Sequence, residues 1–179
     1  SRFYAGFAMV PTLEPSNQQE AYDMMQSAFE LSEALHEPVV LRTLTRLAHS
    51  RAAVEVHEPL EMQNLGICQE RWVLLPGIAR TRYAALVEKQ AEMLAAAEAS
   101  IYNKVEKGQG TLGIIACGIA YNYVKEAMGD GANVLKVSQY PLPEEAIRQL
   151  ASENSSVIVI EDGQPVVEQQ VKALLGAGY

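Results

Sequence analysis

Short apolar segments alternate with helical segments along the last third of the chain, and this alternation limits the possible folds more than any other feature. The apolar segments are 112–116, 133–137 and 157–160, and the helical ones are 119–128, 143–150 and 165–175. Strands that alternate with helices usually pair in parallel through right-handed crossovers. The apolar segments hold almost no polar residue, as expected where helices cover both faces of a sheet. We predict one parallel α/β domain over residues 107–179.

The first third of the chain predicts a helix followed by a buried strand. Ser16 or Asn17 can cap the helix, Gln19 and Glu20 lie three residues further on, as in a capping box, and Pro38 ends the helix. The apolar residues 39–41 then predict a short strand.

A basic segment follows this strand and holds the candidate site residues, Arg42, Arg46 and His49. Ligands of open α/β sheets bind at the carboxyl ends of the strands, so these residues are candidates for a site or for a domain interface. The alternative is a solvated loop whose arginines pair with nearby glutamates. No complete catalytic constellation occurs in the 179 residues, so we assign no catalytic, cofactor-binding or metal-binding residue.

The middle of the chain is typical of a connector that ends in one long helix. Residues 78–101 lack Pro and Gly and are rich in strong helix formers, which predicts a single helix of about six turns. We therefore expect a first domain over 1–75, a connecting segment over 76–106 and a second domain over 107–179.

Two motif matches in the last third carry little weight. Residues 108–113 satisfy GxGxxG, but a dinucleotide-binding loop opens a helix, whereas this one opens a strand. Residues 129–131 read Gly-Asp-Gly, with Asn154 after 22 further residues, as in the magnesium site of thiamine diphosphate enzymes. In those enzymes both metal ligands follow strands. Here the glycines follow a helix, which indicates a helix terminus and a surface turn.

Two further positions lie at the carboxyl edge of the predicted sheet. The turn 117–121 places a helix N-terminus there, a geometry that can bind an anion but occurs in every parallel α/β unit. Glu161 and Asp162 follow the third strand and could bind a metal or cap the last helix, and we favour capping.

Composition argues against several classes of function. The net charge is −8, with 22 acidic against 14 basic residues, which disfavours nucleic-acid binding. The two cysteines, Cys68 and Cys117, lack metal-ligand spacing and fit a reducing, cytoplasmic compartment. No apolar run reaches the roughly 20 residues of a membrane span. The chain opens on Ser1 and stops directly after a helix, as expected for a piece of a longer protein.

Several segments, in one order along the chain, resemble the large (alpha) subunit of indolepyruvate ferredoxin oxidoreductase. In the first half these are residues 1–5, 13–24, 29–33, 38–43 and 45–46. In the second half, residues 113–127 resemble the opening of that subunit's transketolase-C-terminal-like domain, and residues 140–143 and 159–161 follow at the family's spacing. The resemblance implies the C-terminal part of a thiamine pyrimidine-binding-type α/β domain, joined by the long helix to a transketolase-C-terminal-like parallel α/β domain.

The resemblance also implies an activity for the parent enzyme, the oxidative decarboxylation of indolepyruvate and other aryl pyruvates to aryl-acetyl-CoA. Coenzyme A would be the acyl acceptor and ferredoxin the electron acceptor, with a beta subunit as partner. The implied cofactors are thiamine diphosphate, Mg²⁺ and [4Fe–4S] clusters. The thiamine-activating glutamate, the diphosphate-binding domain and the cluster region would lie outside this stretch. We therefore expect the chain alone to bind no cofactor, to be inactive and to self-associate.

Arg46 and His49 match the arginine and histidine of an F-R-T-S-H stretch in related pyruvate enzymes, but the aromatic and hydroxyl positions differ. A role in domain contacts is therefore at least as well supported as a catalytic one, and we expect Arg46 to bridge the first domain to another segment. Two alternatives remain open: a stand-alone flavodoxin-like binding module, or a subunit of another thiamine enzyme of the transketolase or 2-oxoacid dehydrogenase type.

Overall fold

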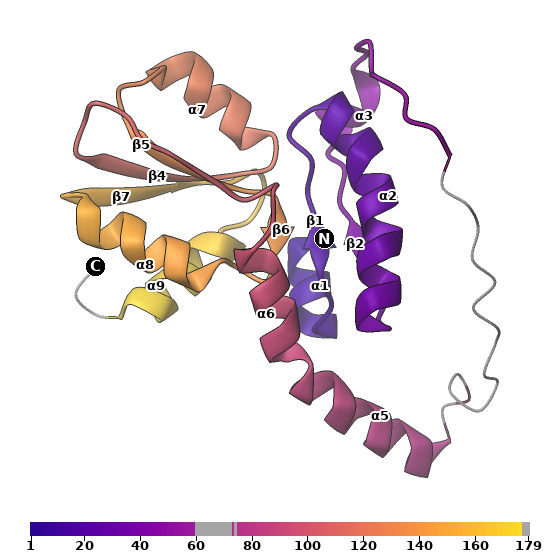
Figure 1. Ribbon diagram of the computed structural model, residues 1–179. Helices are drawn as coiled ribbons and strands as arrows, with labels where there is room; N and C mark the ends of the chain where they lie inside the picture. The colour runs from indigo at the N-terminus through magenta and orange to yellow at the C-terminus, as the bar shows by residue number, and fades with distance from the viewer. Residues whose placement is uncertain (60–72, 74, 177–179) are drawn as a thin grey trace.

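The computed structural model describes residues 1–59, 73 and 75–176 and places them in two neighbouring α/β units (Figure 1). In chain order the elements are α1 (Arg2–Ala8), β1 (Thr12–Leu13), α2 (Gln18–Leu35), β2 (Val40–Leu41), α3 (Thr45–His49), α5 (Pro76–Glu88), α6 (Gln90–Glu98), β3 (Lys104–Glu106), β4 (Leu112–Cys117), α7 (Ala120–Met128), β5 (Asn133–Val137), β6 (Gln139–Tyr140), α8 (Glu144–Glu153), β7 (Ser156–Ile160) and α9 (Val166–Leu175). This arrangement confirms the predicted α/β class. Among the described residues, no helix is both long and apolar enough to cross a membrane.

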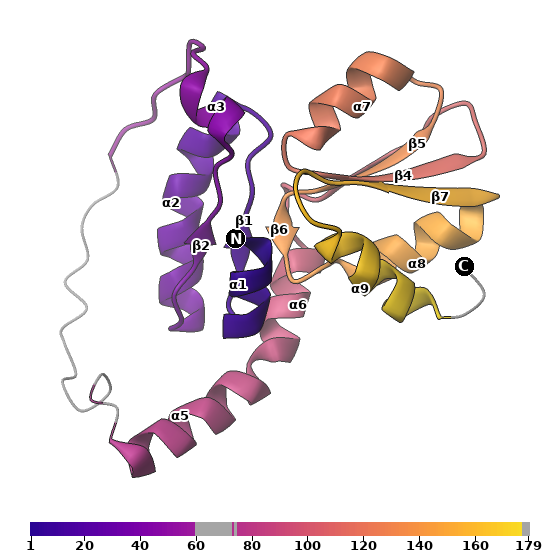
Figure 2. The same ribbon diagram turned by 180° about the vertical axis from the view of Figure 1, so that it is seen from behind.

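The larger sheet has the order β3-β5-β4-β7, and β4 pairs in parallel with both β5 and β7, as predicted. Helix α7 covers one face, and α8 and α9 cover the other (Figures 1 and 2). Because side chains alternate across a strand, Ile114 and Ala116 pack towards α7, whereas Ile115 and Cys117 face α8 and α9. The short antiparallel strand β3 at the edge was not predicted, because its three residues carry no apolar pattern.

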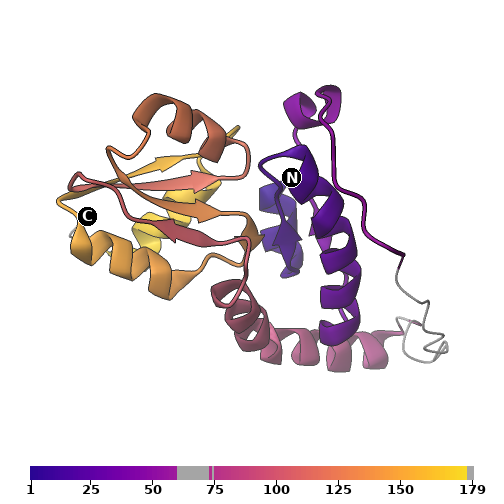
Figure 3. The same cartoon turned by 45° about the horizontal axis from the view of Figure 1, so that its top comes forward.

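The smaller sheet has the order β2-β1-β6, with β1 parallel to β2 and antiparallel to β6. Strand β6 comes from the last third of the chain and brings Tyr140 opposite Thr12. The first and last thirds of the chain therefore contribute to one sheet. The first unit, which is the smaller sheet with α1, α2 and α3, lies beside the second unit, which is the larger sheet with α7, α8 and α9 (Figure 3). The predicted division of the chain into a first domain over 1–75, a connecting segment over 76–106 and a second domain over 107–179 remains a prediction.

Both predicted cap residues of α2 take part in its N-terminus. The Asn17 side-chain oxygen accepts a hydrogen bond from the Glu20 amide at 2.9 Å. The Glu20 carboxylate in turn accepts from the amide and the hydroxyl of Ser16, at 2.8 and 2.7 Å. The strand predicted after Pro38 is also confirmed, as β2, but Val40 and Leu41 are half-buried rather than buried, since β2 lies at the edge of its sheet.

The prediction of one uninterrupted helix over residues 78–101 is wrong, because α5 and α6 are separate helices that meet at Lys89. The Lys89 ammonium donates to the Leu35 carbonyl at 2.6 Å and lies 3.1 Å from the Glu37 carboxylate, so this junction is tied to the end of α2. Helix α6 buries Met93 and Ala97, whereas α5 has no buried residue and extends away from both sheets (Figures 1 and 3). The helix-forming composition of residues 78–101 predicted a helical conformation, but it could not show which half of this segment packs against the rest of the protein.

One further region differs from its predicted structure, and another lies outside the residues that the structure describes. The basic segment after β2 contains a short helix, α3, where a loop was one alternative. Residues 60–72, which include Cys68, and residue 74 fall outside the described residues.

Large apolar side chains remain exposed on the first unit. Phe3, Tyr4 and Phe7 of α1 are 63%, 73% and 80% exposed, and the Phe3 ring contacts the rings of the other two. The expected exposed apolar surface is therefore present, whereas self-association remains a prediction.

Candidate functional site

A buried carboxylate, that of Glu14, lies where the two sheets meet. Glu14 directly follows β1, and its amide donates to the Ser138 carbonyl, just beyond β5, at 2.7 Å. Its side chain is fully buried and accepts four hydrogen bonds. Arg2 donates two of them, at 2.8 and 2.9 Å, Tyr140 donates one at 3.1 Å, and Arg42 donates the fourth. Each carboxylate oxygen accepts two of these bonds, as a buried charge requires.

The Arg2 guanidinium extends this network to the end of β7. Its remaining terminal nitrogen donates to the Glu161 carboxylate at 2.7 Å. Burial works against the charged form of Arg2, but the hydrogen bonds and charge of Glu14 raise its pKa above the usual value. Glu161 also accepts from the amides of Val167 and Glu168, at 3.1 and 3.0 Å, and so caps α9. The favoured capping role for this acidic position is thus confirmed.

The turn predicted as a possible anion site lies against Glu14. Gly118 follows β4 with a positive φ of 53°, and a Cβ there would lie 2.6 Å from the Glu14 side chain. Nearby, burial raises the pKa of the Cys117 thiol to about 12 and the pKa of Tyr140 well above its usual value. The Glu14 side chain of the first unit therefore packs directly against this turn of the larger sheet.

The three candidate residues of the basic segment do not come together. Arg42 joins the network through Glu14, and its other donor reaches the Ser1 hydroxyl at 3.0 Å. Arg46 is exposed; it donates to the Tyr123 hydroxyl of α7 at 3.2 Å, and its guanidinium carbon lies 5.7 Å from the centre of that ring. The expected bridge from Arg46 to another segment is confirmed. His49 is exposed at the end of α3, and its side chain shows no hydrogen bond or ion pair to the part of the chain that is described.

Sequence reasoning did not single out Arg2, Glu14 or Tyr140 as site residues. The one local signal was an acid placed directly after Leu13 of β1, at the carboxyl end of a strand. The partners come from far along the chain, so this signal could not identify them.

A second buried ion pair also joins the two units. The Lys136 ammonium, on β5, contacts the Glu20 carboxylate of α2 and lies 5.1 Å from the centre of the Tyr121 ring. Burial lowers the pKa of Lys136 although Glu20 opposes this shift. The pKa of Glu20 is also lowered: burial acts in the opposite direction, but hydrogen bonds from Lys136 and Ser16 outweigh it. Burial dominates the pKa shift of Lys136 but not that of Glu20, because the lysine side chain is the more deeply buried partner, 3% against 15% exposed.

The residues that resemble a thiamine diphosphate magnesium site do not fit one. Gly129 ends α7, and the Asp130 carboxylate lies 3.6 Å from the Lys125 ammonium at the surface. Asn154 is engaged elsewhere, since it accepts from Asn133 at 2.7 Å and donates to the Leu150 carbonyl at 2.8 Å. Within 1–59, 73 and 75–176, no group of three or more His, Cys, Asp and Glu side chains could hold a metal ion.

The GxGxxG match is a turn between two strands, β3 and β4. A Cβ at Gly108 would lie 2.2 Å from the Ala132 carbonyl oxygen, and one at Gly110 would lie 2.4 Å from that of Gly131. These glycines permit close backbone contact, and they do not open a helix.

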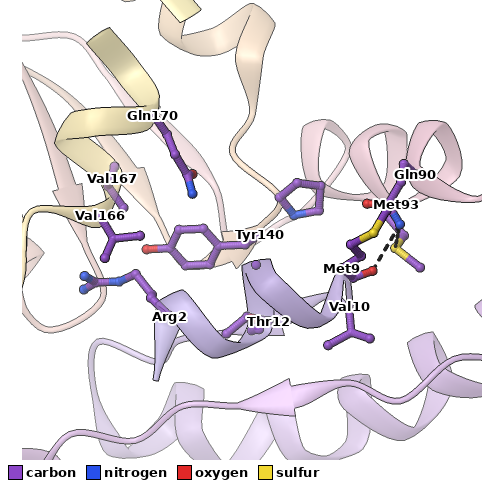
Figure 4. Close-up of a pocket in the computed structure, with 13 residues that line it drawn as sticks. Arg2, Met9, Val10, Thr12, Gln90, Met93, Tyr140, Val166, Val167 and Gln170 are labelled. Carbon is purple, nitrogen blue, oxygen red and sulfur yellow. Dashed lines mark hydrogen bonds between the residues drawn. The ribbon is translucent and has the colours of Figure 1, made fainter. Parts of the chain in front are cut away.

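A small cavity of about 130 Å³ lies beside the Glu14 network, between α1, α6 and α9 (Figure 4). Arg2 and Tyr140 reach it from one side, and Gln90, which donates to the Met9 carbonyl at 3.1 Å, closes the other. Ligand pockets usually measure about 300–1,000 Å³, so this space is too small for a cofactor the size of thiamine diphosphate.

Fold and site together define a class: an α/β protein segment whose two units are joined through buried ion pairs. No protein-family model matches the chain. It is 38% identical over 99% of its length to the indolepyruvate oxidoreductase subunit IorA of Methanothermobacter thermautotrophicus. The subunits of the same name match at 40% over 97% of the chain in Methanothermobacter marburgensis and at 38% over 97% in Archaeoglobus fulgidus. The chain spans about 30% of the length of these curated relatives. It is a homologue of one segment of the indolepyruvate oxidoreductase subunits IorA, which confirms the family resemblance.

Proposed function

We propose that this chain is a segment of the large subunit of an indolepyruvate oxidoreductase, and that it fixes two α/β units of that subunit in position. The observation that carries the proposal is the match to IorA subunits at 36–40% identity over 96–99% of the chain. These relatives are named as subunits, which favours a partner subunit for this protein as well.

The full proposal includes the chemistry that the family resemblance implies. The whole enzyme would decarboxylate indolepyruvate and other aryl pyruvates oxidatively, transfer the acyl group to coenzyme A and pass the electrons to ferredoxin. Thiamine diphosphate, Mg²⁺ and iron–sulfur clusters would be its cofactors. Among the described residues no group of three or more His, Cys, Asp and Glu side chains could hold a metal ion, so the Mg²⁺ and cluster sites would lie elsewhere in the enzyme.

The role of this chain in the enzyme would be structural: it would hold two α/β units in a fixed relative position. Two arginines and two glutamates lie buried between the units, so the charges of Arg2, Arg42, Glu14 and Glu161 balance. Of these ion pairs the one between Arg2 and Glu161 joins the two units, and separating the units would break it. The network would therefore hold the units, and any catalytic groups attached to them, at one relative position.

A stand-alone flavodoxin-like module is less well supported. Such a module would bind its ligand at the carboxyl edge of the parallel strands. In this chain Glu14 already lies against Gly118 at that edge.

The test is a reconstitution of the longer protein with its partner subunit, thiamine diphosphate and Mg²⁺. We expect indolepyruvate to reduce ferredoxin in a reaction that requires coenzyme A. A folded, cofactor-loaded complex that is inactive with indolepyruvate and phenylpyruvate would overturn the proposed reaction.

The isolated chain provides the complementary test. Calorimetry with millimolar thiamine diphosphate and Mg²⁺ should give no saturable binding. Saturable binding that disappears in Asp130→Ala would mean that the Gly-Asp-Gly turn is a metal site after all.

A further inference from the structure

Strand β2 has the sequence of an internal strand but lies at the edge of its sheet. Residues 39–41 are all apolar, a pattern typical of strands covered on both faces and flanked by other strands. Both residues of the neighbouring strand β1 are buried, whereas Val40 and Leu41 are only half-buried. Within the described residues β2 pairs with β1 alone.

The backbone of β2 presents hydrogen-bonding groups on its open side. The amides of Val40 and Arg42 donate to the carbonyls of Pro11 and Leu13, at 2.9 and 2.8 Å. Because these groups alternate along a parallel strand, the N–H and C=O of Leu41 point away from β1. An additional strand could pair with them.

An apolar depression of about 140 Å³ adjoins this open edge. Its lining contains no charged side chain and consists of Met25, Ala28, Phe29, Ser32, Val39 and Leu41. Phe29 is 66% exposed and Met25 is 50% exposed, although both are large apolar residues on the helix that packs beside β2. Apolar surface next to an open strand fits an occupant that is extended and apolar.

We propose that the edge of β2 pairs with a further β-strand from the part of the longer protein outside this chain, and that apolar side chains of that strand fill the depression. The chain covers 29–30% of its curated relatives, so about 70% of their length (100 − 30) lies outside the matched segment. This choice of occupant rests on the proposed function, since it assumes a protein of similar length. A second copy of the chain fits less well, because it would offer only its own two-residue strand at this edge.

Hydrogen exchange at single amides, resolved by fragmentation mass spectrometry, tests the pairing. In the isolated chain the amides of Val40 and Arg42 should be protected and that of Leu41 should exchange rapidly. In the longer protein the Leu41 amide should become protected by at least tenfold, while Val40 and Arg42 serve as internal controls. Rapid exchange of Leu41 in the longer protein would overturn the proposal.

Two other results would also overturn it by identifying a different occupant. Protection of Leu41 in the isolated chain that rises with protein concentration would indicate pairing between copies. Protection in the monomeric chain, independent of concentration, would mean that this same chain covers its own edge.

A charged substitution in the depression provides a second measurement. Phe29→Glu should leave the unfolding temperature of the isolated chain within error but lower that of the longer protein by several degrees. Ile101→Glu, at a residue that is 74% exposed and does not line the depression, is the matched control and should change neither. Equal melting temperatures of Phe29→Glu and the unchanged longer protein would count against the proposal. Neither measurement depends on activity, so failure of the proposed reaction and failure of the pairing are distinguishable.

Discussion

Replacement of the buried carboxylate tests whether the Glu14 network holds the two units together. Glu14→Gln keeps the size of the side chain and removes its charge, so Arg2 and Arg42 retain only Glu161 as a buried counter-charge. Removal of one partner from a buried ion pair costs about 3–5 kcal/mol. For a chain of this size that loss corresponds to a fall in unfolding temperature of roughly 6–20 °C.

The assay is urea unfolding followed by circular dichroism, with tyrosine fluorescence as a second probe. Glu153→Gln, which breaks an exposed ion pair to Lys107, is the control and should not shift the midpoint. The double variant Glu14→Gln/Arg42→Gln restores the charge balance and should be more stable than the sum of the two single changes predicts. A loss below about 1 kcal/mol in Glu14→Gln would refute the reasoning, since it would mean that the buried charges need no partner.

Four further changes test neighbouring parts of the structure. Gly118→Ala should cost about 2–4 kcal/mol in urea unfolding, because its positive φ of 53° and the 2.6 Å approach to a buried side chain both oppose a Cβ; a neutral result would mean that the turn can relax. In a Cys68→Ser background, Cys117 should resist a thiol reagent at pH 8 until urea unfolds the chain, because burial raises the pKa of this thiol to about 12; prompt labelling would contradict its burial. The pKa of Glu20 is lowered, since hydrogen bonds from its partners outweigh burial. The stabilisation that Glu20 contributes is therefore complete above its pKa in the unfolded chain, about 4.3, and is lost as pH falls through its pKa in the folded chain. Glu20→Gln should reduce the acid dependence of the unfolding free energy between pH 6 and 2. Arg46→Ala should cost less than about 1 kcal/mol, below the 1–3 kcal/mol expected of a semi-buried contact, because Arg46 is exposed; a larger thermal shift would indicate a deeper role.

The candidate site was only partly accessible to sequence reasoning. Arg42 was selected because it follows a strand, and it belongs to the buried network. Arg46 and His49 were selected on the same grounds and lie apart, because α3 turns the chain and leaves them exposed. Position after a strand predicts the correct edge of a sheet, but it does not determine which side chains point into the junction.

Local patterns determined the parts of this protein whose cause is local. The apolar segments near residues 114, 135 and 158 became parallel strands because helices cover both faces, and the α2 cap formed from residues within four positions of one another. Only the tertiary structure decided the rest. The strands β1, β2 and β6 have two residues each, and pairing between distant segments defines them. The Arg2–Glu161 contact joins residues 159 positions apart, and it exists because burial of both units forces each charge to find a partner.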